Sequence, residues 1–216
     1  TMRTFTLNTK DAAEVGQSRF ITETGKYIGK FVRAEFIKST QETDGIELDF
    51  VADDGRRANF LSLWLTNVDG RDLYGKKVLS AIMACLKLRT INEGPIKFQD
   101  KDGNEKRSVG LPDLMNKPIG VLLQREEYQK DDGSTGYKFN INAPFNAETE
   151  QTASEVLKSA KAEQLAGMVA SLADRKPRQQ QRGGFNRGAH DYAKASGGRG
   201  PAQRMPSNFE DMDDDI

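Results

Sequence analysis

The chain has 216 residues, of which 36% are hydrophobic and 30% are charged, and its 32 Lys and Arg residues balance its 32 Asp and Glu residues. These totals are typical of one soluble domain with additional segments, and the short apolar runs predict neither a transmembrane helix nor a secretory signal. The single cysteine, Cys85, excludes an internal disulfide and is typical of a reducing cytosol.

The charges are segregated along the chain. Residues 1–175 hold 25 Lys and Arg against 26 Asp and Glu, residues 176–208 hold 7 against 1, and residues 209–216 hold 0 against 5. This distribution indicates a near-neutral body, a basic tether and an acidic tip.

The first 24 residues form an N-terminal segment, with a short strand predicted at 3–7 and a short helix at 11–17. Residues 25–40 are rich in aromatic and β-branched side chains, but these fall on both faces of an ideal strand. A bend at Gly29 or a β-bulge would reconcile them, so we expect one long, irregular strand here.

The next two strands are predicted to form a hairpin. Residues 46–52 alternate well and Asp53-Asp54-Gly55 is a turn signal, so the inward side chains should be Ile46, Leu48, Phe50 and Ala52. The return strand, 59–66, then places Leu61, Leu63 and Leu65 in the core. Phe60, Ser62 and Trp64 therefore share the opposite face.

A helix with a broad apolar stripe is predicted over 71–89, and Cys85 should pack within it. An additional hairpin follows, with strands at 96–99 and 106–109. The last hairpin pairs 118–128 with 136–145 around a turn at 130–133. Residues 151–175 then form a predicted amphipathic helix, whose stripe must dock on the body or on a second copy of the chain; this leaves a homo-oligomer open.

From Lys176 the hydrophobic periodicity ends and Gly, Gln, Arg and Pro dominate, which predicts a disordered basic linker over 176–208. Before it, three strands, a helix and two more strands are the chain order of a five-stranded oligonucleotide-binding (OB-fold) barrel over 25–150. A β-sandwich would need more strands, and a doubly wound sheet would need more helices. We therefore predict a mainly β fold.

The tip, Phe209-Glu-Asp-Met-Asp-Asp-Asp-Ile216, intersperses apolar residues with acids and resembles the acidic tips of single-stranded DNA-binding proteins. The bacterial tip closes in Asp-Asp-Asp-Ile-Pro-Phe, whereas this sequence ends at Ile216 without the Pro-Phe. In the body, Gly25-Lys-Tyr, the helix after the third strand and Tyr137-Lys-Phe-Asn-Ile are similar to the diverged phage-encoded members of that group.

The resemblance implies a protein that coats single-stranded DNA in the cytoplasm of an infected bacterial host. It also implies that the tip recruits replication or recombination proteins, through Phe209, Asp211, Met212, Asp213, Asp214, Asp215 and Ile216. On a flexible tether, the tip could also occupy a cationic groove when DNA is absent.

Binding of single strands needs flat rings for bases and cations for phosphates. Phe60 and Trp64, about 13 Å apart along one strand, meet the first need unless they pack beneath the additional hairpin or the terminal helix. Weaker aromatic candidates are Phe31, Tyr128 and Tyr137. The candidate cations are Arg33, Arg56, Arg57, Lys97, Lys106, Arg107, Arg125 and Lys138.

Catalytic patterns are weak. The only histidine, His190, lies in the predicted linker, and no phosphate-loop glycine pattern is present. Pro112-Asp113 followed by Glu127 and Lys130 is similar to a restriction-type metal nuclease, but the spacing sends Glu127 and Lys130 to opposite strand faces. We therefore expect no enzymatic activity, metal or cofactor. The alternatives are a recombination mediator or protein adaptor and, third, a metal-dependent nuclease.

Overall fold

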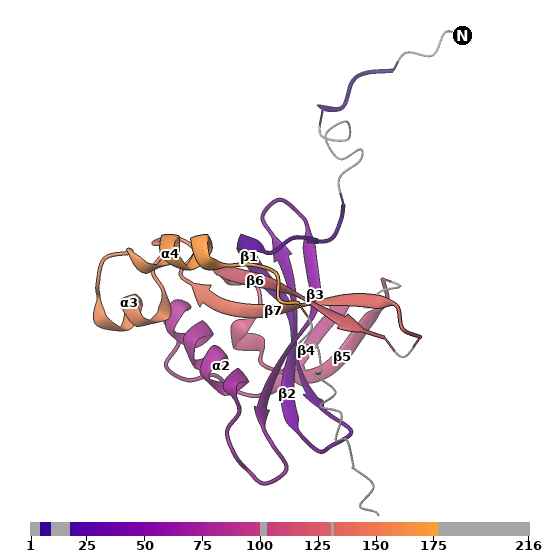
Figure 1. Cartoon of the computed structure of the whole chain (residues 1–216), viewed down its shortest axis with the longest axis vertical. Helices are drawn as coiled ribbons and strands as arrows, with labels where there is room; N and C mark the ends of the chain where they lie inside the picture. Colours follow the sequence, from indigo (N-terminus) through magenta and orange to yellow (C-terminus); the bar gives the residue numbers. More distant parts are fainter. Residues whose placement is uncertain (1–4, 10–17, 100–102, 131, 177–216) are drawn as a thin grey trace, which may run out of the picture. The chain divides into compact units, whose positions relative to one another are not determined.

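The computed structural model describes residues 5–9, 18–99, 103–130 and 132–176. This part of the chain is mainly β, with seven strands in one antiparallel sheet and a few short helices gathered at one side (Figure 1). The elements are β1 (Gly25–Lys38), β2 (Asp44–Ala52), β3 (Arg57–Thr66), α2 (Tyr74–Cys85), β4 (Gly94–Gln99), β5 (Glu105–Gly110), η1 (Pro112–Leu114), β6 (Pro118–Gln129), β7 (Thr135–Phe145), α3 (Ala153–Lys158) and α4 (Gln164–Ser171).

The long strand β1 is the centre of the sheet. The order β3-β2-β1-β5-β4 runs through it, and β6 pairs with its first half and carries β7. The predicted additional hairpin is therefore β4–β5, joined to β1 beside Glu35. Strands β3 and β7 contact each other, but in the described residues no hydrogen-bonded ladder joins them. The sheet is open at this edge, so the closed barrel is not seen.

The irregularity expected in β1 is a register shift between Phe31 and Arg33 in its pairing with β2. The extra residue changes which side chains point inward, so both Phe31 and Ala34 are buried. The prediction of a bulge in this strand is confirmed. Phe31, a candidate for stacking on bases, is fully buried and packs edge-on against Phe50. Its ring is closed to a base.

The hairpin of β2 and β3 forms as predicted, and Gly55 in its turn has a φ of 88° that favours glycine. The four inward side chains predicted for β2 are buried, and so are Leu61 and Leu63 of β3. A second register shift separates the Leu48 and Phe50 pairings, so β3 bulges beside Asp49.

Helix α2 is shorter than predicted at both ends. The chain stays extended before it because Leu73 donates its N–H to the Leu65 carbonyl. After Cys85 the helix ends, and Lys87 adopts a left-handed φ of 57°. Buried Val78, Ile82 and Cys85 place α2 in the main core, as its stripe predicts.

The single amphipathic helix predicted over 151–175 is wrong: two short helices, α3 and α4, take its place. Ser159, with a left-handed φ of 51°, ends α3. The Glu155 carboxylate accepts hydrogen bonds from the N–H groups of Glu163 and Gln164 and from the N–H group of Thr152. These hydrogen bonds, from Glu163 first and then Thr152, lower the pKa of Glu155 to about 2. The stripe docks on the body through Leu165, which packs with Leu122 and Phe145.

After α4 the chain returns to β6. The N–H of Arg175 donates to the Arg125 carbonyl, and the N–H of Glu127 donates to the Arg175 carbonyl. Arg175 therefore lies beside β6. The predicted helix at 11–17 and all of 177–216, with the tip residues, lie outside the described residues. Of the strand predicted at 3–7, residues 5–7 are described and form no strand, so that part of the prediction is wrong.

Candidate functional site

Phe60 has the most unusual environment among the candidate residues. It lies at the bulge of β3 with a φ of 61°, a conformation in which side chains other than glycine are rare. Its N–H donates to Oδ1 of Asp49, which holds the bulge in place. The ring is 63% exposed. The fold thus fixes the backbone of Phe60 while leaving its aromatic face open to solvent.

Trp64 is the second aromatic residue on this face of β3, separated from Phe60 by the buried Leu61 and Leu63. It is 37% exposed and lies over Gly45 of the neighbouring strand. A Cβ at Gly45 would come within 2.7 Å of the indole ring, so glycine is needed there. The predicted sharing of one non-core face by Phe60 and Trp64 therefore agrees with their exposure.

Arg33 lies beneath Phe60 and is only 5% exposed. Its guanidinium binds Asp49 through Nε at 2.8 Å and Nη2 at 3.0 Å, and Glu35 and Glu47 at 2.7 Å each. Burial lowers the pKa of Arg33, but Asp49 and then the two glutamates raise it overall above its ordinary value. Arg33 was predicted as a phosphate contact, yet its donors are directed at carboxylates instead.

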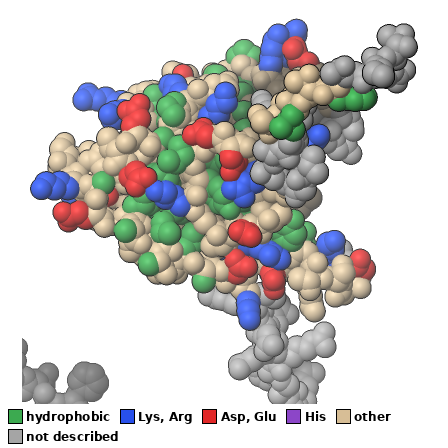
Figure 2. All heavy atoms as spheres, turned by 90° about the horizontal axis from the view of Figure 1, so that it is seen from above, with side chains coloured by type: hydrophobic (Ala, Val, Ile, Leu, Met, Phe, Trp, Pro, Cys, Tyr) green, Lys and Arg blue, Asp and Glu red, His purple; other side chains and the backbone are tan. Residues whose placement is uncertain are grey.

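Most of the other candidate cations are on the surface but lie close to carboxylates. The pairs are Arg56 with Asp54, Lys97 and Arg107 with Glu105, Arg125 with Glu127, and Lys138 with Glu126. Arg57 is exposed at the start of β3. Figure 2 shows the same mixture over one face, where Lys and Arg side chains are interspersed with Asp and Glu side chains.

The β6–β7 hairpin distributes its four candidates over two faces. Arg125 stands opposite Phe139 and next to Tyr137, and its guanidinium carbon is 4.7 Å from the Tyr137 ring centroid. Tyr128 pairs with Gly136 and Lys138 pairs with Glu126, so these two side chains point to the other face. The structure therefore brings Arg125 and Tyr137 together, and it separates them from Tyr128 and Lys138.

Phe98 is a site residue that the sequence analysis missed. It lies on β4, partly exposed, and its ring centroid is 5.1 Å from the guanidinium carbon of Arg33. Lys106 stands opposite Phe98, whereas Lys97 and Arg107 oppose each other on the other face of the hairpin. Alternation within β4 would have separated Phe98 from Lys97, but no local pattern places this hairpin over Arg33.

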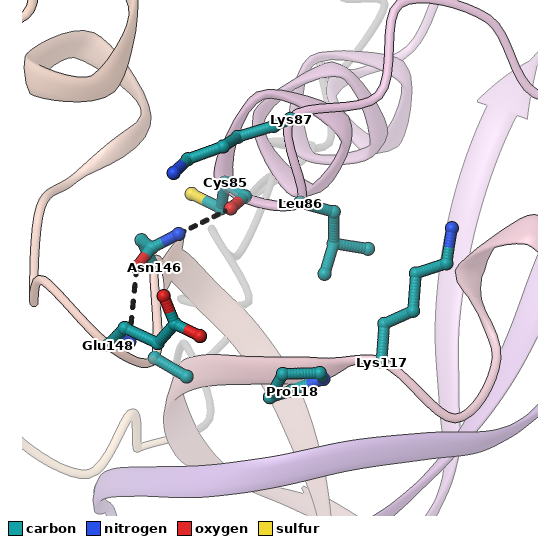
Figure 3. Close-up of a pocket in the computed structure, with 8 residues that line it drawn as sticks. Cys85, Leu86, Lys87, Lys117, Pro118, Asn146 and Glu148 are labelled. Carbon is teal, nitrogen blue, oxygen red and sulfur yellow. Dashed lines mark hydrogen bonds between the residues drawn. The ribbon is translucent and has the colours of Figure 1, made fainter.

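A hollow of about 190 Å³ lies between the end of α2 and the start of β6, with Lys87, Lys117 and Glu148 at its rim (Figure 3). Its buried polar side chain, Asn146, already donates to the Cys85 carbonyl at 2.9 Å. The volume is below the roughly 300 Å³ of ordinary ligand pockets. This hollow is therefore not a candidate site.

Reactive groups are scarce in the described part of the chain. No group of three or more His, Cys, Asp or Glu side chains there is arranged to hold a metal ion. Burial raises the pKa of the Cys85 thiol to about 12, so it is protonated at neutral pH. No helix among the described residues is both long and apolar enough to cross a membrane.

Comparison with known proteins adds no assignment. No protein-family model matches the sequence, and a search of curated proteins finds no match.

Proposed function

We propose that this chain is a non-enzymatic, sequence-independent single-stranded DNA-binding protein of a phage replication or recombination system. Its body binds the strand, and residues 209–216 recruit partner proteins. The observation that carries the proposal is Phe60, whose exposed ring is held by a left-handed backbone that favours glycine. Residues in such conformations cluster at functional sites because the surrounding structure must stabilise them.

The strand order supports an OB-fold body. The path β3-β2-β1-β6-β7, with α2 after β3, has the connectivity of the five-stranded barrel, and contacts between β3 and β7 occur where that barrel would close. Single strands bind such barrels by stacking on aromatic residues and by phosphate contacts with cations. We assign the stacking to Phe60 and Trp64.

Phosphate contacts would come from surface cations that give up a carboxylate partner and bind a DNA phosphate in its place. Arg107 and Arg125 are the most loosely paired of these arginines, because each lies 3.8 Å from its carboxylate, on Glu105 and Glu127 respectively. Surface ion pairs contribute only about 0–1 kcal/mol, so exchanging a carboxylate for a phosphate costs little. Arg57, Lys106 and Lys138 are further candidates.

The test is fluorescence anisotropy of a labelled oligo-dT strand titrated with wild type, Phe60→Leu and Trp64→Leu. Each loss of a ring should weaken binding by about 1–3 kcal/mol while the melting temperature changes little. Phe5→Leu is the matched control, because Phe5 is also exposed but lies outside the sheet. Unchanged affinity in both β3 variants would refute the assignment, and absence of binding by wild type would refute the function.

A protein adaptor is the second candidate. A groove of about 590 Å³ lined by Phe36, Leu65 and Val109 gives apolar surface that a protein partner could cover. If the barrel binds protein and DNA binding is incidental, substitution of Val109 by Asp should abolish partner capture and leave the oligonucleotide titration unchanged.

A further inference from the structure

The environment of Arg33 differs from that of a residue that binds phosphate. One positive charge faces three carboxylates, from Glu35, Glu47 and Asp49, and each guanidinium nitrogen donates to at least one of them. The cluster is therefore net negative, and the Arg33 side chain is almost completely buried. A phosphate approaching this point would meet repulsion and would find the donors occupied.

The same guanidinium contacts two aromatic rings that come from distant parts of the sheet. Its central carbon is 5.3 Å from the Phe60 centroid and 5.1 Å from the Phe98 centroid. In the strand order β3-β2-β1-β5-β4, Phe60 and Phe98 belong to strands on opposite sides of the strand that carries Arg33. Arg33 therefore joins the additional hairpin to the exposed ring of β3.

Asp49 completes the connection. Its Oδ1 accepts hydrogen bonds from both Nη2 of Arg33 and the N–H of Phe60. The ring of Phe60 thus lies against the guanidinium, and its backbone is tied to the carboxylate that holds the guanidinium. Both the ring and the backbone of Phe60 are therefore in contact with the same ion-paired cluster.

We propose that Arg33 is a positioning residue: it holds the Phe60 ring outward as a platform for a nucleobase, with Phe98 supporting it, and it does not contact phosphate. This inference rests on the proposed function and names how one element of it works. The strand would place a base on Phe60, while its phosphates lie away from the acidic cluster.

The experiment measures oligo-dT affinity at several salt concentrations for wild type, Phe98→Leu and Arg33→Lys. Arg33→Lys loses the planar guanidinium that reaches three carboxylates and two rings, and Phe98→Leu loses one of those rings, so either variant should weaken binding by about 3- to 10-fold. The slope of log affinity against log salt should stay at the wild-type value. A phosphate contact by Arg33 would instead leave Arg33→Lys with full affinity, and that result would overturn the proposal.

Arg33 is buried, so Arg33→Lys also tests the fold, and Phe98→Leu provides the independent measurement. The effect of Phe98→Leu on oligo-dT affinity should disappear in a Phe60→Leu background, because the ring that Phe98 helps to position is then absent. A purely structural role for Phe98 would lower the melting temperature and weaken binding equally in both backgrounds, which would also overturn the proposal. If wild type binds and Phe60→Leu weakens it while Phe98→Leu and Arg33→Lys do not, only this inference fails and the proposed function stands.

Discussion

Phe60 occupies a backbone conformation that glycine would adopt without strain. A left-handed residue with a Cβ loses roughly 1–2 kcal/mol relative to the right-handed form. The contact with Arg33, at 5.3 Å, offsets about 0.5–1 kcal/mol of this cost. A hydrophobic ring that is 63% exposed adds little burial in return. The residue is therefore better explained by what its ring contacts than by the stability of the strand.

The strain itself can be measured with a matched pair. Phe60→Gly and Phe60→Ala both remove the ring, but only glycine relieves the positive φ. We expect the glycine variant to have the larger free energy of unfolding in urea, by about 1 kcal/mol.

The same two substitutions at Ser62, two residues along β3, provide the control. At Ser62 the alanine variant should have the larger free energy of unfolding, because glycine is disfavoured in an ordinary strand. An alanine variant at position 60 that is as stable as the glycine variant would show that the left-handed conformation carries no strain.

Sequence reasoning placed Phe60 and Trp64 correctly on the outer face because the alternation around Leu61 and Leu63 is regular. It misread Arg33 for a physical reason. Two of the three carboxylates around Arg33, those of Glu47 and Asp49, come from the neighbouring strand β2, and the pairing of Arg33 with Asp49 depends on the bulge after Phe31. When this register is unknown, the sequence does not distinguish a buried arginine in a strand from an arginine on the surface.

At the scale of elements, the β6–β7 hairpin offers two faces with different chemistry. Arg125 and Tyr137 form a stacked pair on one face, while the other has Tyr128 over Gly136 and the paired Lys138. We expect Tyr137→Leu to weaken oligonucleotide binding by about 1 kcal/mol or more, and Tyr128→Leu to have little effect. Anisotropy titrations of the two variants decide this. Equal losses would mean that the strand contacts both faces, and no loss in either variant would mean that it contacts neither ring.

The connection between α3 and α4 predicts a pH dependence. The pKa of Glu155 is lowered to about 2 in the folded chain, from an ordinary value near 4.5, by N–H donors from Glu163 and Thr152. Since the folded pKa is lower, this contribution to stability is complete above about pH 4.5 and is lost as pH falls toward 2.

We expect Glu155→Gln to lower the melting temperature at pH 7 and the difference from wild type to shrink as pH falls below 4.5. Glu163→Gln is the control, because the Glu163 side chain is exposed and Glu163 binds the Glu155 carboxylate through its backbone N–H, which the substitution keeps. A wild-type advantage that persists at pH 2 would contradict the assignment.

The failure to predict two helices after residue 151 has a local cause. Thr152-Ala-Ser-Glu155 is a capping box, a start signal that is readable from sequence. The break at Ser159 has no glycine or proline to mark it, and apolar residues continue on both sides at helical spacing. The left-handed Ser159 ends α3, and beyond it the Glu155 carboxylate accepts the N–H groups of Glu163 and Gln164 at the start of α4, contacts that hydrophobic periodicity does not predict.

For the whole molecule, the distribution of charge along the chain is more informative about DNA binding than the net charge of zero. Several of the described cations, among them Lys26, Arg56 and Lys97, are paired with carboxylates within the body, whereas the tip of 209–216 carries five acids and no cation. If this tip competes with DNA, its deletion should tighten oligo-dT binding, most clearly at low salt where charges are least screened.

Titration of full-length and truncated protein at two salt concentrations measures that effect. A full-length variant with the five acids replaced by Asn or Gln separates charge from length and should behave like the truncation. The truncated protein should also lose its replication partners while still coating strands. Equal or weaker DNA affinity after truncation would mean that the tip does not compete.

Strand order was predictable and closure was not. Each hairpin is marked locally, by turn residues such as Asp53-Asp54-Gly55 and by alternation in the strands that flank it. The approach of β3 to β7 joins strands that lie 69 or more positions apart in the sequence, and no turn signal marks the register shifts in these strands and their neighbours. The pairing of β6 with the first half of β1 is non-local in the same way.

Cys85 and Trp64 are each the single residue of their type in the chain. The thiol is 1% exposed, on the helix whose end is held by Asn146. A thiol-reactive dye can label it only when the core opens, so the labelling rate of unmodified protein reports how often α2 separates from the sheet. If a strand stacks on Trp64 as proposed, its fluorescence reports occupancy of the outer face, and the two residues then allow strand binding and core opening to be followed independently.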